Sequence, residues 1–189
     1  MEFTLVYQGP LRANGGLTDK QAIRRVFHMQ LAKLWQQLPL VHYGPPRGSF
    51  LDDTPPPSKV SIIQQVGAFR FAPLVCSKLQ LVARLSIVML RPEPPGSIVT
   101  AGGDIDNRLK TLFDALRMPK ATSEIPSGDA PQPGEDPFFC LLEDDNLIVK
   151  VSVDTDRWLD PHAGLTDVHL LLHVTTKALV ATSANTDLG

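Results

Sequence analysis

The segment KLQLVARLSIVML, residues 78–90, carries an apolar side chain at every second position. Such alternation is typical of a β-strand with one buried face, because successive side chains of a strand point to opposite sides. The segment DVHLLLHVTT, residues 167–176, alternates in the same way. We therefore expect two long strands, with 78–90 in the centre of a sheet. Their inward faces would consist of Leu79, Leu81, Ala83, Leu85, Ile87 and Met89, and of Val168, Leu170, Leu172 and Val174.

Residues 17–38, LTDKQAIRRVFHMQLAKLWQQL, have helical spacing instead. Thr18 is the expected N-cap, and Gln21 three residues later would complete a capping box. The apolar stripe of this helix would be Ile23, Val26, Phe27, Leu31, Leu34 and Trp35. Its basic side is either a solvated face or a face that contacts phosphates, and it consists of Lys20, Arg24, Arg25 and His28.

A second helix should begin near Asp106 or Asn107 and end close to Pro119, which cannot continue a helix. Its buried side would be Leu109, Leu112, Phe113 and Leu116. Residues 2–8 and 147–153 are predicted to be strands, and residues 60–75 to hold one or two short ones. Proline-rich loop insertions cover 44–59 and 119–137, and within the second we expect Ser123–Pro137 to be mobile. Residues 181–189 are expected to be a disordered tail.

This order of elements predicts an α/β (α+β) fold, a mixed β-sheet with helices packed on it, in one domain over residues 1–180. The hydrophobic content of 43% argues against bulk disorder. Aromatic residues make up only 6%, which argues against a stacking platform for single strands. The net charge of −2 is unusual for a nucleic-acid binder, although bound divalent cations would reverse the local sign at an acidic site.

The N-terminal residues lack the basic and long apolar runs of a signal peptide, and the chain has 2 cysteines. No apolar stretch is long enough for a membrane span. We therefore expect a cytoplasmic protein with no membrane partner. Cys76 and Cys140 are interpreted as small buried residues.

The stretch GGDIDNRLKTLFDAL, residues 102–116, admits a simple structural interpretation. Asp106 would cap the helix, Asp104 would be a loop residue, and Lys110 would pair with Asp106 four residues earlier. A calcium loop starting at Asp104 is excluded, because its fifth, sixth and twelfth positions hold Arg108, Leu109 and Ala115.

A second acidic group, Glu143, Asp144 and Asp145, directly precedes the strand expected at 147–153. Three adjacent carboxylates repel one another, and solvent, protonation or a cation must relieve the repulsion. Aspartates in such numbers suit a hard divalent ion, which binds a few carboxylates and keeps waters for substrate phosphates. Two such ions can stabilise the attacking and leaving oxygens of a phosphodiester displacement.

Together, these motifs resemble the RusA-type Holliday junction resolvases, most closely over residues 79–153. The pattern D-x-D-N-x-x-K is matched by Asp104, Asp106, Asn107 and Lys110. The D-A-L that follows on the same helix is matched by Asp114, Ala115 and Leu116, and the downstream D-D by Asp144 and Asp145.

The resemblance implies a prokaryotic or phage-encoded homodimer that cuts four-way DNA junctions with Mg²⁺ or Mn²⁺, one active site for each nicked strand. It implies metal-binding or catalytic roles for Asp104, Asp106 and Asp145, with Asp144 as a further metal ligand and Lys110 as a catalytic residue. We expect the DNA backbone to be contacted by Arg24, Arg25, Arg108 and Lys150. The alternative is a protein of the same fold that binds nucleic acid or assembles with a partner through the Ser123–Pro137 loop, without nuclease activity.

Asp167, His169 and His173 would share one face of the last strand. Their spacing allows a transition-metal site, but a polar outer face is the simpler interpretation. No phosphate-binding glycine loop is present, since AGGD lacks the required spacing and the following lysine.

Overall fold

The computed structural model describes residues 1–92 and 105–189. Its main sheet has four strands in the order β1 (Glu2–Pro10), β7 (Asp167–Ala178), β4 (Leu81–Arg91) and β6 (Ile148–Arg157). β7 is antiparallel to both β1 and β4, whereas β6 is parallel to β4. The predicted mixed sheet of an α+β fold is therefore confirmed, with β4 between two neighbours. The inward-facing residues expected for β4 and β7 are all buried.

A smaller sheet consists of β2 (Gln64–Val66), β3 (Phe69–Val75) and β5 (Phe138–Leu142). Residues 60–75 thus contain two strands, which turn at Gly67, where φ is +59° and a side chain would be strained. β5 lies parallel to β3 and was not predicted from the sequence. Its run FFCLL is buried on both sides and therefore has no alternating pattern.

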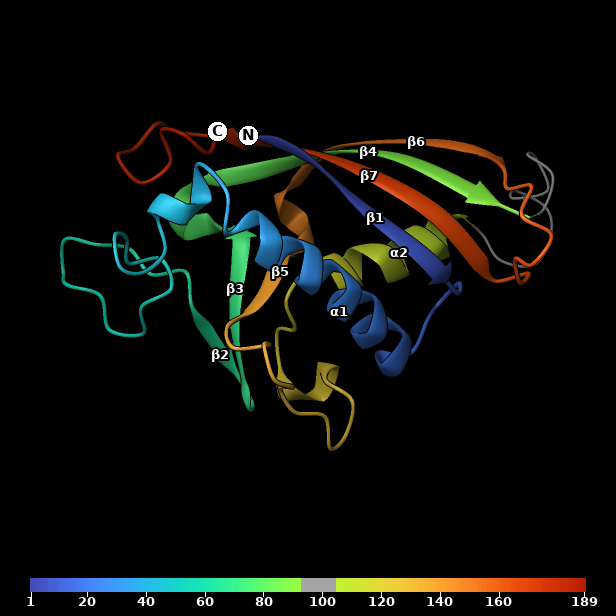
Figure 1. The fold of residues 1–189 in the computed structure, drawn as a ribbon, viewed down its shortest axis with the longest axis horizontal. Helices are drawn as coiled ribbons and strands as arrows, with labels where there is room; N and C mark the ends of the chain where they lie inside the picture. Colours follow the sequence, from blue (N-terminus) through green and yellow to red (C-terminus); the bar gives the residue numbers. More distant parts are fainter. Residues whose placement is uncertain (93–104) are drawn as a thin grey trace.

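The two helices α1 (Leu17–Leu34) and α2 (Ile105–Leu116) cover one side of the main sheet (Figure 1). Between them and the sheet lies the principal hydrophobic core, in which Ile23 and Phe27 of α1 and Leu112 and Leu116 of α2 are almost fully buried. Short 3₁₀ turns occur at η1 (Leu40–His42), η2 (Ser77–Leu79), η4 (Thr122–Glu124) and η5 (Asp145–Leu147).

The start of α1 differs from the expectation. The N-cap is Gly16, not Thr18, and the Gly16 N–H donates to the Asp19 carboxylate at 3.0 Å. Asp19 is therefore the third helical residue of the capping box, the role that we assigned to Gln21. Gln21 itself is buried. The helix also ends at Leu34 instead of Leu38, since Pro39 has no N–H to bond the Trp35 carbonyl and its ring would clash with that carbonyl in a continuing helix.

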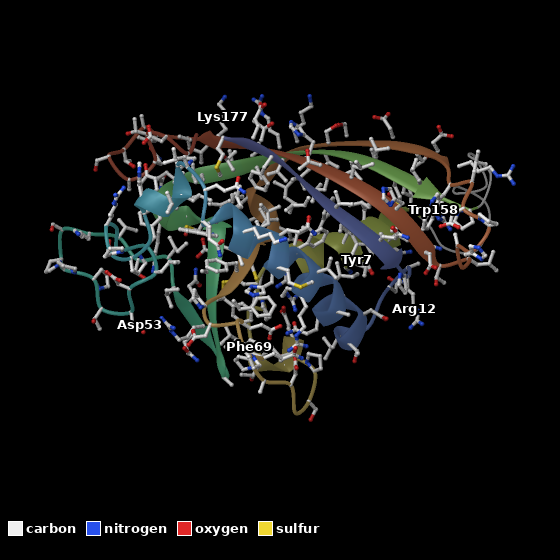
Figure 2. The ribbon with its side chains drawn as sticks, viewed as in Figure 1. Tyr7, Arg12, Asp53, Phe69, Trp158 and Lys177 are labelled. Atoms are coloured by element: carbon white, nitrogen blue, oxygen red, sulfur yellow. The ribbon has the colours of Figure 1, made fainter. Side chains whose placement is uncertain are left out.

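The opposite side of the main sheet carries no helix in the described parts of the chain (Figure 1). Figure 2 shows Lys177 on this uncovered side and Tyr7 on the side toward α1. The outward-facing residues are largely polar, and they include Thr4, Arg84, Ser86, Lys150, Ser152, His173, Thr175 and Lys177. We call this surface the open face. In residues 1–92 and 105–189, no helix is long and apolar enough to cross a membrane.

Residues 181–189 pack against the domain, contrary to the expected disordered tail. Leu188 and Asn185 are buried, at 0% and 1% exposure. The Asn185 amide donates to the carbonyl oxygens of Leu79 and Val180, both at 2.8 Å, and accepts from the Thr182 N–H at 2.7 Å. The residues of this segment are mostly small and polar. The sequence alone therefore did not show that the side-chain amide of Asn185 is buried.

Replacing Asn185 by Ala should lower the free energy of unfolding by about 1–3 kcal/mol, because the buried carbonyl of Leu79 and the partly buried carbonyl of Val180 lose their donor. Urea denaturation measures this change. Ser183→Ala, at an exposed position in the same segment, is the control and should change little. Equal stability of the two variants would show that the segment is not bound in solution as described.

Candidate functional site

The loop after β1 fixes the first half of α2. The Gly15 N–H donates to the Thr111 hydroxyl at 2.9 Å, and the Arg108 guanidinium donates to the Leu11 carbonyl. A Cβ atom on Gly15 would lie only 2.7 Å from the Thr111 methyl group, so this approach requires glycine. Arg108 is buried, at 4% exposure, and the expected DNA contact at Arg108 is therefore corrected to a structural role.

α2 begins at Ile105, which places Asp106 inside its first turn and not at the cap position that we assigned to it. A carboxylate is still favourable there, next to the positive end of the helix dipole. Asp106 and Lys110 are both exposed. Within the described ranges Lys110 forms no ion pair, so the simple pairing with Asp106 is absent. Asp104 lies outside the described residues.

The second acidic group lies in the turn between β5 and β6, and its carboxylates have different partners. Glu143 accepts from the Ser77 N–H and hydroxyl, both at 2.7 Å, and from the Gln64 amide at 2.7 Å. Partial burial raises the pKa of Glu143, but these hydrogen bonds outweigh burial and the pKa is lowered. Glu143 is thus committed to joining this turn to β2 and η2.

Asp144 forms an ion pair with Lys120 at 2.5 Å and accepts from the Asn146 N–H at 3.0 Å. Lys120, and next the Asn146 N–H, lower the pKa of Asp144 to about 2. Lys120 was not singled out from the sequence, because it follows Pro119 in a loop and carries no periodic signal. Asp145, the first residue of η5, is exposed.

α2 and η5 are in direct contact, which brings the two acidic motifs to neighbouring elements. Asp106 and Lys110 are exposed in the first two turns of α2, whereas Arg117, directly after its last residue, is buried at 9% exposure. Burial lowers the pKa of Arg117, but Glu124, Asp114 and also Asp145 raise it overall. Asp145 therefore lies within electrostatic range of Arg117, at the C-terminal end of α2.

Two of the exposed carboxylates could bind a divalent cation. Mg²⁺ is usually bound through one or two carboxylates together with waters and substrate phosphates. The exposed carboxylates of Asp106 and Asp145 have suitable oxygen chemistry. No group of three or more His, Cys, Asp or Glu side chains that could hold a metal occurs within residues 1–92 and 105–189. Any complete cage thus requires donors beyond the described carboxylates.

Arg24 does not face solvent, and its expected DNA contact is corrected. It is 3% exposed, and its guanidinium donates to the carbonyl oxygens of Arg117 at 3.1 Å and Asp114 at 2.9 Å. These carbonyls belong to the C-terminal end of α2, where unpaired acceptors and the negative end of the dipole favour a cation. Lys20 also turns toward α2 and forms an ion pair with Asp114 at 2.8 Å.

Arg25 is likewise engaged within the protein, which corrects its expected DNA contact. It forms ion pairs with Asp129 and Glu135, both at 2.8 Å. His28, one turn along α1, donates from Nε2 to the Gly134 carbonyl and accepts the Phe139 N–H at Nδ1, at 3.1 and 2.9 Å. These contacts anchor the 119–137 insertion to α1, in contrast to the mobility expected for it.

Of the four predicted DNA contacts, Lys150, on β6, is the one that the structure leaves fully exposed. On β7, His173 forms a hydrogen bond with the Thr4 hydroxyl at 3.3 Å, and Asp167 accepts from the Gly164 N–H at 2.9 Å. The polar outer face thus describes these residues better than a transition-metal site. Cys76 and Cys140 are buried as expected, and burial raises the pKa of both thiols to about 12.

Comparison of the chain with protein-family models, with curated proteins and with solved structures finds no match in any of the three.

The Arg25 anchor predicts a measurable loss of stability. Arg25→Gln should lower the free energy of unfolding by about 1–3 kcal/mol, because the buried carboxylate of Glu135 loses its charged donor. Arg12→Gln is the matched control, since its ion pair with Asp19 is largely exposed and should contribute only about 0–1 kcal/mol. Equal losses in urea denaturation would contradict the anchoring role.

His28 predicts a dependence of stability on pH. Burial lowers its pKa below 6.5, with Glu135 and Arg25 as the charged neighbours. Below pH 6.5 the unfolded chain binds a proton at this residue that the folded chain does not, so the free energy of unfolding should fall as the pH drops toward the native pKa. His28→Gln should flatten this slope between pH 7 and 5.5, whereas His162→Gln, at an exposed site, should not.

Proposed function

We propose that the protein is a Mg²⁺- or Mn²⁺-dependent endonuclease that cuts branched DNA, with the four-way junction as its expected substrate. The observation that carries the proposal is the contact between α2, with exposed Asp106 and Lys110, and η5, with exposed Asp145. The likeness of these motifs to RusA-type resolvases gives the reaction class. An α+β fold alone would be compatible with many activities.

Asp106 and Asp145 would hold the cation, with Asp104 contributing as the resemblance implies. A bound divalent cation would supply activation of the attacking water and neutralise charge on the phosphate. Asp144, which Lys120 keeps ionised, is less available as a ligand because its charge is already paired. The main role of Asp144 would therefore be to hold the η5 turn through Lys120 and the Asn146 N–H, and metal binding would be secondary.

Lys110 would hold the scissile phosphate. Its ammonium group is exposed on α2 and is one helical turn from Asp106. A cation in that place stabilises negative charge that grows on the phosphate oxygens during displacement. This contribution does not require Lys110 to exchange a proton.

A homodimer follows from the same proposal, because a two-fold symmetric junction presents two equivalent strands for cleavage. The burial of Arg24 and Arg108 and the pairing of Arg25 remove three of the four expected backbone contacts. The DNA contact would therefore depend on Lys110, Lys150 and other exposed cations.

Cleavage of a labelled synthetic four-way junction tests the proposal. With Mg²⁺ or Mn²⁺ the wild-type protein should release nicked strands, and with EDTA it should not. Asp106→Asn, Asp145→Asn and Lys110→Gln should each lower the cleavage rate by at least about 100-fold. Asp52→Asn, in the 44–59 loop, is the control of equal charge change and should cut at the wild-type rate.

A specific observation favours the second candidate, a nucleic-acid-binding or assembly protein without nuclease activity. Glu143 and Asp144 are already satisfied by protein donors, so two of the three acidic residues need no cation. Failure to cut junctions, other branched substrates and linear DNA, together with no heat of Mg²⁺ or Mn²⁺ binding in calorimetry, would support this candidate and contradict the first.

A further inference from the structure

The open face contains a polar hollow with a volume of about 250 Å³. It lies across β7, β4 and β6, on the side of the sheet away from α1 and α2 (Figure 1). Its lining combines two cations with hydroxyl groups, an imidazole and one carboxylate: Glu2, Arg84, Ser86, Lys150, Ser152, His173 and Thr175.

Arg84 and Lys150 are directly opposite each other on β4 and β6. Like charges at opposed positions destabilise a sheet. In the described parts of the chain neither side chain forms an ion pair, although acidic residues outnumber basic ones by 20 to 18. The carboxylate in the hollow, Glu2, accepts from the Thr175 hydroxyl at 3.3 Å. An anion between the two cations would remove their repulsion.

A break in the strand register brings the two cations together. Ala83 is opposite Ile148, but the next residue, Arg84, is opposite Lys150, so Val149 is an extra residue in β6. Because side chains alternate between faces, a regular ladder would place Lys150 on the side opposite to Arg84. Bulges of this kind are devices that re-aim a side chain. Here the bulge turns Lys150 onto the open face.

Hydroxyl groups provide further donors around the cations. Ser86 and Ser152 lie two residues further along the same strands, on the same face, and are joined by a hydrogen bond of 3.2 Å. Thr175 lies opposite Arg84 on the other neighbouring strand. Lys177, two residues beyond Thr175, stands on the same face (Figure 2). Cations therefore lie on three adjacent strands, over a width of about 10 Å.

We propose that this hollow binds a phosphodiester group of a nucleic acid strand that runs across β7, β4 and β6. The inference rests on the proposed function and deepens it, since it moves the DNA contact from the basic side of α1 to the open face. Its two cations suit the charge of a phosphodiester backbone, and its mainly polar lining does not suit an apolar chain. Arg84 and Lys150 each contact a phosphate oxygen, and the Ser86 hydroxyl, which accepts from Ser152, donates its own hydrogen to the group.

The test is binding of a fluorescent four-way junction, measured by anisotropy in EDTA so that cleavage cannot occur. Arg84→Gln plus Lys150→Gln should weaken binding about 10-fold or more, and should reduce the slope of log K against log salt by about 2, one per lost phosphate contact. Arg84→Lys keeps the charge and should retain most of the affinity. Lys33→Gln plus Lys59→Gln, at two exposed positions away from the hollow, is the control with the same change of net charge.

The outcomes separate this inference from the nuclease proposal. If the Arg84 and Lys150 double variant matches the Lys33 and Lys59 control in affinity and salt slope, the hollow is not the contact, whether or not the wild type cuts junctions. If the slope falls by about 2 but no divalent cation supports cleavage, the phosphodiester site stands and the nuclease proposal fails. If the wild type binds phosphatidylserine vesicles through these residues but not the junction, the assignment to nucleic acid is overturned.

Discussion

The buried guanidinium of Arg24 joins the two helices on which the candidate site depends. It occupies the C-terminal end of α2, where Asp114 and Arg117 offer carbonyl oxygens that no intrahelical N–H can reach. Burial lowers the pKa of Arg24, yet the guanidinium remains the natural partner of these acceptors. Removing it would leave buried carbonyls unpaired, which costs more than the net gain of one hydrogen bond. The orientation of α2, and hence of Asp106 and Lys110, follows from this contact.

Three further contacts limit the movement of α2. Arg108 and Thr111 connect its first half to the loop after β1, and Arg117 connects its end to Glu124 of η4 at 2.8 Å. The opposing element, η5, is held by Glu143 through Ser77 and by Asp144 through Lys120. Many of the charges near the candidate site thus stabilise its walls, whereas Asp106, Lys110 and Asp145 are exposed. A rigid frame around a few exposed groups is the arrangement that precise positioning requires.

The basic residues of α1 show why the type of a residue does not predict its partners in the folded protein. Arg24 and Arg25 are adjacent, but one caps α2 while the other anchors the 119–137 insertion through Asp129 and Glu135. These partners lie far away in the sequence. Lys150 was expected to contact DNA, but its pairing with Arg84 gave no local signal, because a bulge in β6 determines their common side.

Local pattern by itself determined the strands β1, β4, β6 and β7, the two helices, and the inward faces of β4 and β7, because alternation and helical spacing depend only on neighbouring residues. It also singled out Asp106, Lys110 and Asp145. Only the tertiary structure decided that β5 joins a second sheet, that residues 181–189 pack on the domain through Asn185, and that α2 contacts η5. Each of these depends on partners distant in the chain, whose pairing is set by packing and by the need to satisfy buried polar groups.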